Sequence, residues 1–204
     1  LYYNQFKNDT DIDHILEAYE GMDGEALKTL GKRFRLAGRI VSLRSFGKAT
    51  FFHLQDSTKR MQIFTSRETL GAETYAIFKK YDIGDIVGVE GCLFRTKTGE
   101  LTVEASEVCL LTKSIRPLPE KFHGLKDVET RYRQRYVDII VNPHTREVFR
   151  MRSAVVHEFR SFMAERGFLE VETPLMQSIP GGATARPFIT HHNTLDMQLY
   201  MRVA

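Results

Sequence analysis

The fold of this chain is decided by the stretch Phe51-Phe52-His53-Leu54-Gln55-Asp56-Ser57-Thr58-Lys59-Arg60-Met61-Gln62-Ile63-Phe64. Two runs of β-type residues flank the polar residues 57–59, which predicts two short strands joined by a turn. Successive side chains of a strand point to opposite faces, so one apolar face is expected to fill a core, with Phe52, Leu54, Met61 and Ile63. The opposite face is then expected to carry Phe51, His53, Gln62 and Phe64.

The neighbouring segments predict three strands, a helix and two more strands. Phe34 to Ser45 predicts the first strand, and Arg67 to Lys80 has apolar residues at helical spacing. Ile83 to Arg95 and Leu101 to Thr112 predict two strands around the turn Thr96-Lys97-Thr98-Gly99-Glu100. This is the order of the five-stranded OB-fold barrel, whose helix lies between strands 3 and 4.

The hydrophobic pattern divides the chain into four parts. Residues 11–30 have apolar residues at helical spacing, with a stop at Gly21. Pro117, Pro119 and Gly124 interrupt any period after the barrel, which is typical of a linker. The predicted parts are an N-terminal helical segment at 1–32, the OB-fold barrel at 33–112, a linker at 113–128 and the start of a second domain at 129–204.

The second domain is predicted to begin with two helices and a strand. Glu129 to Val141 is the first predicted helix, and Asn142-Pro143 is expected to break it. Thr145 to Arg166 is predicted to form a long helix with one apolar stripe. Phe168 to Val171 is predicted to begin a strand that Pro174 ends or places at a sheet edge.

Composition excludes several classes of protein. Of the 204 residues, 42% are hydrophobic and 27% charged, which argues against collagen-like, coiled-coil and fully disordered chains. No run approaches the roughly 18–20 apolar residues of a membrane-spanning helix, so no membrane is expected as a partner. The net charge of +3 is too small to predict a nucleic-acid partner by itself, although a local basic patch can exist within such a total.

Two cysteines are too few for a disulfide-stapled secreted domain. A turn centred on residues 96–100 would place Cys92 opposite a residue near Glu104, roughly 16 Å along the strand from Cys109. Both are therefore predicted to be free thiols of a cytoplasmic protein. The N-terminus has no signal-peptide pattern, and the chain begins without Met and ends within an alternating run, which predicts a piece of a larger protein.

The outward face of the predicted barrel has the residues of a single-strand reader. Strands 2 and 3, with the loops between strands 1–2 and 4–5, form the usual oligonucleotide face of an OB fold. Phe51 can stack on a base, Gln62 can pair with a base edge, and Arg44 in the first loop can hold a phosphate or base oxygen. Alternatively, Phe51 packs under the N-terminal helix and Gln62 is a solvated strand residue. His53 is interpreted as an ordinary strand histidine.

The second domain resembles a known family. Motif 1 of class II aminoacyl-tRNA synthetases is similar to Gly167-Phe168-Leu169-Glu170-Val171-Glu172-Thr173-Pro174, and an OB barrel precedes that motif in the subgroup that charges Asp, Asn and Lys. Three further stretches resemble the bacterial-type lysyl-tRNA synthetases. They are Arg116-Pro117-Leu118-Pro119-Glu120-Lys121-Phe122-His123-Gly124-Leu125, Tyr132-Arg133-Gln134-Arg135-Tyr136 and Ile179-Pro180-Gly181-Gly182-Ala183-Thr184-Ala185-Arg186-Pro187-Phe188-Ile189-Thr190-His191-His192-Asn193.

The resemblance implies an α+β protein, in which the OB-fold barrel precedes the mixed α/β, antiparallel-sheet catalytic domain of class II. It implies a homodimeric lysine–tRNA ligase that activates lysine with ATP and Mg²⁺ to lysyl-adenylate and transfers it to tRNA(Lys). One alternative is an aspartyl- or asparaginyl-tRNA synthetase, against which the run at 180–188 argues. The other is a non-catalytic OB module that binds single strands, which would not need the second domain.

The resemblance also assigns roles to residues. It implies anticodon binding by Phe51, Gln62, Arg44 and Glu100. A backbone contact to lysine falls on Gly182, with Gly181 and Ala183 beside it, although such a glycine pair is otherwise typical of a turn. The motif 1 proline of the dimer interface falls on Pro174, and Phe159 on the apolar stripe of the long helix is expected in the same interface.

Motifs 2 and 3 and the carboxylates that bind Mg²⁺ are not among the 204 residues. No catalytic residue and no metal ligand is therefore assigned within the chain, and the sites for ATP and Mg²⁺ are expected downstream of Ala204. The 204 residues alone are expected to be inactive.

Overall fold

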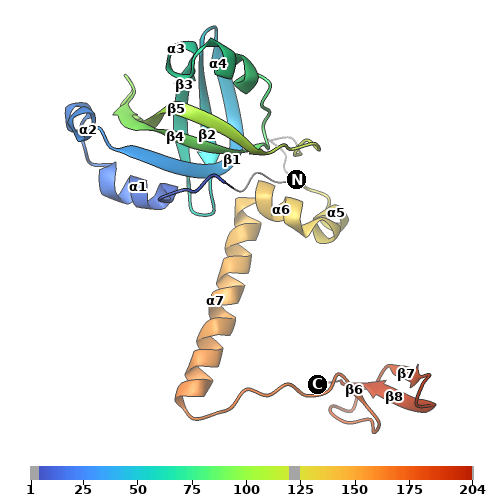
Figure 1. Ribbon diagram of the computed structural model, residues 1–204. Helices are drawn as coiled ribbons and strands as arrows, with labels where there is room; N and C mark the ends of the chain where they lie inside the picture. Colours follow the sequence, from blue (N-terminus) through green and yellow to red (C-terminus); the bar gives the residue numbers. More distant parts are fainter. Residues whose placement is uncertain (1–4, 120–124, 204) are drawn as a thin grey trace. The chain divides into compact units, whose positions relative to one another are not determined.

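The computed structural model describes residues 5–119 and 125–203, as drawn in Figure 1. The chain divides into two compact units, Leu1–Val141 and Asn142–Ala204. Part of the stretch quoted at 116–125, Glu120 to Gly124, lies outside the described residues. Among the residues that are described, no helix has both the length and the apolar character to cross a membrane.

The first unit contains a closed five-stranded barrel. Its strands are β1 (Arg33–Phe46), β2 (Ala49–Gln55), β3 (Arg60–Ser66), β4 (Ile86–Arg95) and β5 (Leu101–Thr112). Hydrogen bonds join them in the order β1-β2-β3-β5-β4, and β1 also pairs with β4 to close the ring. The short helices α3 (Arg67–Leu70) and α4 (Ala72–Phe78) follow β3 in the chain. The predicted OB-fold order is confirmed.

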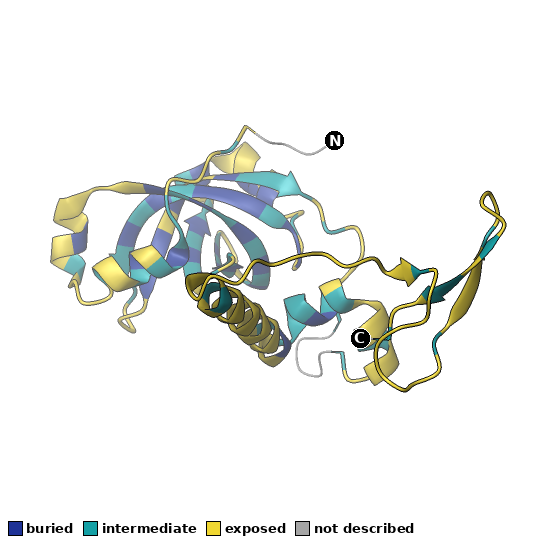
Figure 2. Ribbon diagram, turned by 90° about the horizontal axis from the view of Figure 1, so that it is seen from below, coloured by how far each residue is buried: buried dark blue, intermediate teal, exposed yellow. Residues whose placement is uncertain are grey.

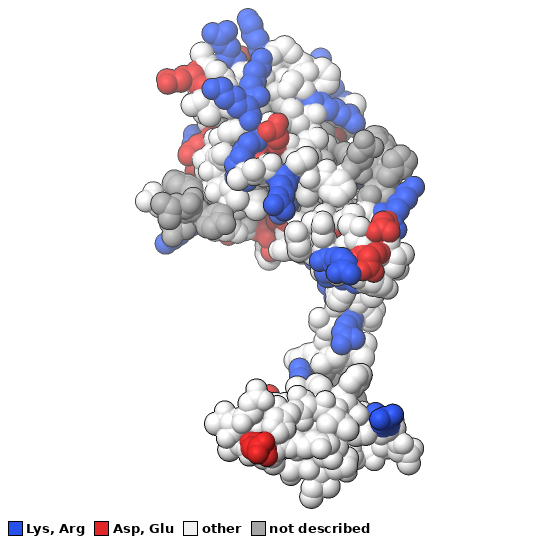
Figure 3. Space-filling view, turned by 90° about the vertical axis from the view of Figure 1, so that its right-hand side faces the viewer, with Lys and Arg blue, Asp and Glu red and all other residues white. Residues whose placement is uncertain are grey.

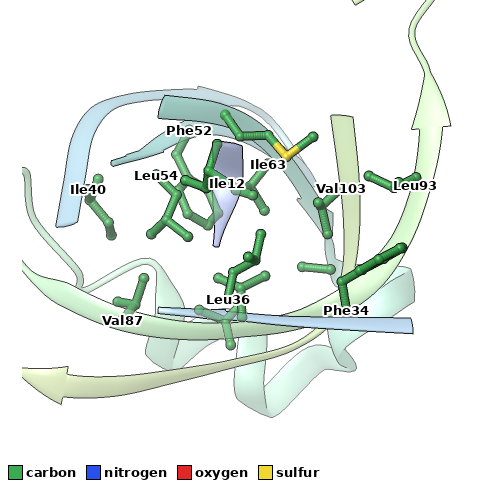
Figure 4. Packing of buried hydrophobic residues seen from close by; sticks show 14 of the residues in the cluster. Ile12, Phe34, Leu36, Ile40, Phe52, Leu54, Ile63, Val87, Leu93 and Val103 are labelled. Atoms are coloured by element: carbon green, nitrogen blue, oxygen red, sulfur yellow. The ribbon is translucent and has the colours of Figure 1, made fainter. Parts of the chain in front are cut away.

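The predicted alternation along β2 and β3 is also confirmed. The antiparallel ladder pairs Phe51 with Phe64 and His53 with Gln62. The four side chains expected in the core are at most 2% exposed: Phe52, Leu54, Met61 and Ile63. Figure 4 shows the barrel interior that they share with side chains from other strands, including Leu36 and Val103. Because the core takes every second residue, the intervening side chains reach the outer surface.

The helical region predicted at 11–30 forms two helices, α1 (Ile12–Tyr19) and α2 (Gly24–Leu30). Asp11 caps the first helix by accepting a hydrogen bond from the backbone N–H of His14. Ile12 is fully buried in the barrel core, and its backbone N–H donates to Asp56 Oδ2 at 2.7 Å, at the turn between β2 and β3. This contact fixes α1 to the barrel.

The helix predicted at 129–141 is two helices, α5 (Val128–Arg133) and α6 (Arg135–Val141). The backbone leaves the helical region at Gln134, with φ −116° and ψ 55°. Asp138 on α6 is fully buried, and its carboxylate accepts from Arg131 Nε at 3.0 Å and from Arg135 Nη1 at 2.6 Å. The paired arginines offset the desolvation of this carboxylate. The two ion pairs therefore stabilise the interruption at Gln134 between α5 and α6.

The second unit confirms one sequence-based prediction and corrects another. The helical segment predicted to end before Asn142-Pro143 does end at Val141, and Pro143 then begins α7 (Pro143–Glu165), two residues before the predicted start at Thr145, because a proline at the first helical position leaves no hydrogen bond unmade. The strand predicted at Phe168 to Val171 is absent from the described residues, since no neighbouring segment pairs with it. The sheet consists of β6 (Met176–Gln177), β7 (Ile189–His192) and β8 (Met197–Met201), in the order β6-β8-β7.

Both cysteines are free, as predicted. Cys92 pairs with Glu104 across the β4–β5 ladder, whereas Cys109 pairs with Gly88 further along it. Burial raises the pKa of the Cys109 thiol, which keeps it protonated at neutral pH.

Candidate nucleic-acid interface

A shallow pocket of about 260 Å³ lies on the outer face of the barrel, formed by β1, β2, β3 and the β4–β5 loop. Its walls include all four residues predicted to bind an anticodon: Arg44, Phe51, Gln62 and Glu100. The remaining walls are formed by Ser42, Phe46, His53, Thr96 and Thr98. Residues that are up to 58 positions apart in the sequence therefore meet at one site (Ser42 to Glu100).

Arg44 lies on a strand, which corrects its predicted place in the loop between the first two strands. Only Gly47 and Lys48 join β1 to β2. Gly47 has a φ of +60°, a conformation that glycine adopts without a steric cost. Because the turn is this short, β1 stays paired along the pocket and places Arg44 directly opposite Phe51.

Phe51 is half-buried and has aromatic neighbours on its own face of the barrel. Its ring centroid lies 4.8 Å from that of Phe64, with an interplanar angle of 47°. Phe46 approaches it edge-on, with a centroid separation of 6.4 Å. The buried residues of α1, Ile12 and Ile15, belong to the core instead. The ring is thus supported by its neighbours and open to the pocket, as a stacking platform requires.

The amide of Gln62 is held at both ends. Its Nε2 donates to Glu100 Oε2 at 2.6 Å, and its Oε1 accepts from Thr102 Oγ1 at 3.1 Å. An ionised carboxylate can only accept hydrogen bonds, so the carboxylate of Glu100 must face the amide nitrogen of Gln62. The hydroxyl of Thr102 donates to the amide oxygen. One N–H and one lone pair of the amide remain for a ligand. The arrangement presents a donor and an acceptor in a fixed order.

His53 forms the wall beside Glu100, although the sequence indicated only an ordinary strand histidine. Its Nδ1 lies 2.7 Å from the hydroxyl oxygen of Ser42. Its Nε2 lies 3.7 Å from Glu100 Oε1, an ion pair when the imidazole is protonated. The carboxylate of Glu100 therefore lies between His53 and Gln62.

Thr102 and Ser42 are site residues that the sequence reasoning missed. Thr102 is fully buried, and it lies beside Gln62 because β3 and β5 pair in parallel across the closure of the barrel. Ser42 lies opposite His53 only because the β1–β2 ladder shifts register between Ile40 and Ser42. The alternation of residues along β1 and β5 identifies neither contact, because both depend on pairing between strands.

The charge around the pocket suits a polyanion. Arg44 and Lys48 are both exposed at the end of the β1–β2 hairpin. Figure 3 shows Lys and Arg side chains spread over the visible face of the barrel unit with Asp and Glu among them, whereas the visible surface of the second unit is mostly uncharged. Exposed cations beside an aromatic platform supply the phosphate contacts that dominate nucleic-acid affinity.

The residues predicted to bind lysine lie in the second unit and are exposed. Gly182 has a φ of +101°, a conformation that side-chain-bearing residues rarely adopt. The Cβ position of Gly181 would lie 3.6 Å from Gln177 Oε1. Ala183 follows on the same surface segment. The described residues contain no group of three or more His, Cys, Asp or Glu arranged to hold a metal ion.

The long helix α7 of the second unit is exposed along most of its length, as Figure 2 shows, although Thr145 in its first turn is buried. Phe159 is 66% exposed and lines an open apolar cavity of about 770 Å³ together with Phe168 and Leu169. Pro174 is also exposed. Exposed apolar residues gathered in this way are typical of a surface that another part of the protein or a partner covers.

Two family profiles match the chain. One is described as OB-fold nucleic acid binding domain and matches residues 34–111, and the other as tRNA synthetases class II (D, K and N) and matches residues 127–204. The barrel is therefore an OB-fold domain of the nucleic-acid-binding type, followed by the start of a class II tRNA synthetase domain.

Curated relatives identify the branch within that class. The chain is 57% identical over its whole length to the lysine–tRNA ligase of Magnetococcus marinus. Over 98% of its length it is 54% identical to that of Methylobacillus flagellatus and 53% identical to that of Serratia proteamaculans. It spans 40% of the length of each relative. The chain is a homologue of the lysine–tRNA ligases and corresponds to their N-terminal region.

Proposed function

We propose that the complete protein is a cytoplasmic lysine–tRNA ligase, in which this chain recognises the anticodon of tRNA(Lys). The protein would activate lysine with ATP to lysyl-adenylate, release pyrophosphate and transfer the lysyl group to the terminal ribose of the tRNA. The observation that carries the proposal is the convergence of Arg44, Phe51, Gln62 and Glu100 in one pocket of the barrel. The identity to lysine–tRNA ligases supports it.

Each pocket residue has a role that follows from its chemistry. Phe51 stacks on an anticodon base, and Gln62 pairs with the edge of a base. Glu100 orients the amide of Gln62 through their 2.6 Å hydrogen bond. Arg44 holds a phosphate or a base oxygen, since a guanidinium donates in a fixed fork geometry.

We further propose the same division of labour along the chain that the sequence predicts. Residues 33–112 read the anticodon, with the helical segment 1–32 against them, and 113–128 link them to the start of the catalytic domain at 129–204. The backbone of Gly182 contacts lysine, with Gly181 and Ala183 beside it. ATP and Mg²⁺ supply the phosphate chemistry, and we assign none of their ligands to these residues.

The 204-residue chain is expected to bind the anticodon stem-loop of tRNA(Lys) at least tenfold more tightly than the same stem-loop with a substituted anticodon base, because each lost base contact costs about 1–3 kcal/mol. Fluorescence anisotropy at one fixed salt concentration measures this ratio. The same chain alone is expected to show no lysine-dependent ATP–pyrophosphate exchange. Equal affinity for all loops would instead identify a sequence-independent single-strand module.

Gln62→Ala is expected to reduce discrimination more than affinity. Loss of the fixed donor and acceptor removes a base-edge contact, so preference for the correct base should fall about tenfold while affinity for a substituted loop changes little. Thr102→Val should have a similar but smaller effect, because it frees the oxygen end of the amide, and Thr102→Ser should retain wild-type discrimination. A uniform loss of affinity for every loop would show that Gln62 only supports the surface.

The complete protein is expected to be a two-fold homodimer through α7 and the segment at Pro174. Phe159→Asp and Pro174→Asp place a charge in the apolar surface and are expected to produce monomers in sedimentation velocity. Ile77→Asp on α4 changes a half-exposed apolar residue outside this surface and is expected to keep the dimer mass. Folded variants of Phe159 and Pro174 with dimer mass would place the interface elsewhere.

A further inference from the structure

Phe46 is an exposed aromatic residue at the border of the anticodon pocket. It lies at the end of β1, is 65% exposed and lines the pocket together with Phe51 and Gln62. Single exposed apolar side chains are common on protein surfaces and need no special explanation. The position of Phe46 relative to its neighbours is what points to a ligand.

Phe46 belongs to the pocket face of the barrel. Ser42, Arg44 and Phe46 alternate along β1 and all line the pocket, whereas Leu43 between them packs against the core. Across the ladder, Arg44 lies opposite Phe51. The strand therefore aims Phe46 toward the same side as the stacking residue.

Phe46 also continues a row of rings across the face. Its centroid lies 6.4 Å from that of Phe51, and the row goes on to Phe64 at 4.8 Å and to Phe94 at a further 5.9 Å. Stacked nucleotides rise about 3.4 Å per step, and an unstacked strand extends further. The distance from Phe46 to Phe51 is thus of the order of one nucleotide step.

Positive charge accompanies this end of the row. Arg44 precedes Phe46 by two residues and Lys48 follows it by two, and both are exposed. A strand whose base lies on Phe46 would bring its phosphates beside these cations. Aromatic rings interleaved with exposed cations favour single-stranded nucleic acid as the occupant.

We propose that Phe46 is a second stacking platform, which binds the nucleotide adjacent to the one stacked on Phe51. The ligand is an unpaired nucleotide of the same loop, bound through the face of its base with little selection among the four bases. This inference rests on the proposed anticodon-binding function. It extends the pocket by one nucleotide at the end of the β1–β2 hairpin.

The test is a double-mutant cycle with the 204-residue chain and the anticodon stem-loop of tRNA(Lys). Each loop nucleotide is replaced in turn by an abasic residue, and anisotropy titrations are made with wild type, Phe46→Ala and Phe51→Ala. Phe46→Ala is expected to weaken binding of the intact loop about five- to tenfold. When one particular loop nucleotide is abasic, Phe46→Ala should no longer weaken binding. That nucleotide should be adjacent to the one whose removal abolishes the effect of Phe51→Ala.

Three variants separate stacking from support. Phe46→Leu retains apolar contact with Phe51 without a flat ring and should weaken binding like Phe46→Ala, whereas Phe46→Tyr should bind like wild type. Ile77→Ala, an exposed apolar change on α4, should leave affinity unchanged. The inference is overturned if Phe46→Ala binds as wild type, or if its effect disappears at the same abasic position as that of Phe51→Ala, which would show that Phe46 merely supports Phe51. If Phe51→Ala weakens binding and Phe46→Ala does not, the proposed function stands without this inference. If neither substitution changes the affinity for the stem-loop, the proposed function fails as well.

Discussion

Replacing Phe51 with alanine is expected to weaken binding of the anticodon stem-loop by about 1–3 kcal/mol, or roughly five- to 150-fold in Kd. The ring is held by Phe64 and open to the pocket, so its removal deletes a preformed stacking surface. Anisotropy titrations at one salt concentration measure the change. Because stacking accepts any base, the loss should be similar for cognate and substituted loops.

The expected effect of Phe51→Ala is on binding, with a small effect on the fold. The variant should keep the circular dichroism spectrum of wild type, because the residue lies outside the core cluster. Phe51→Tyr retains a stacking ring and should bind nearly as wild type. If Phe51→Ala binds the stem-loop with unchanged affinity, the anticodon does not stack on this residue.

Replacing the next residue, Phe52, with alanine is expected to lower the free energy of unfolding of the barrel by about 3–5 kcal/mol. Phe52 is only 1% exposed, and its ring centroid lies 5.4 Å from that of Phe78 on α4. Truncation loses buried apolar area and leaves a cavity that the surrounding strands cannot fill. Chemical denaturation followed by circular dichroism measures the shift in midpoint.

The two neighbouring residues serve as controls for each other. Phe52→Ala should bind the stem-loop with wild-type affinity under conditions where it remains folded, whereas Phe51→Ala should unfold near the wild-type midpoint. Should Phe52→Ala prove too unstable to purify, Phe52→Leu should show the same pattern with a loss below about 1.5 kcal/mol. A wild-type midpoint for Phe52→Ala would contradict the assignment of the core.

Local pattern determined much of the barrel. The alternation in residues 51–64 predicts which side chains enter the core, and the turn residues predict how β4 and β5 pair, including Cys92 opposite Glu104. These features depend on the two-residue period of a strand and on short-range turns, both of which are written in neighbouring residues. The prediction of Phe51 and Gln62 on one outward face follows from the same period.

Contacts that depend on distant pairing could not be predicted in this way. Phe168 to Val171 becomes a strand only if another strand pairs with it, and no described segment does. Likewise, the pairing of β1 with β2 decided that Arg44, which was assigned both to the end of the predicted strand and to the loop, lies opposite Phe51.

The sequence by itself determined the order of strands, the core face and the aromatic and amide groups offered for binding, because these follow from local periodicity. Only the tertiary structure decided how the pocket is built. Closure of the barrel brings Thr102 beside Gln62, and the register shift in β1 brings Ser42 opposite His53. The orientation of the Gln62 amide thus depends on hydrogen bonds between residues 38 and 40 positions apart, which no local pattern encodes.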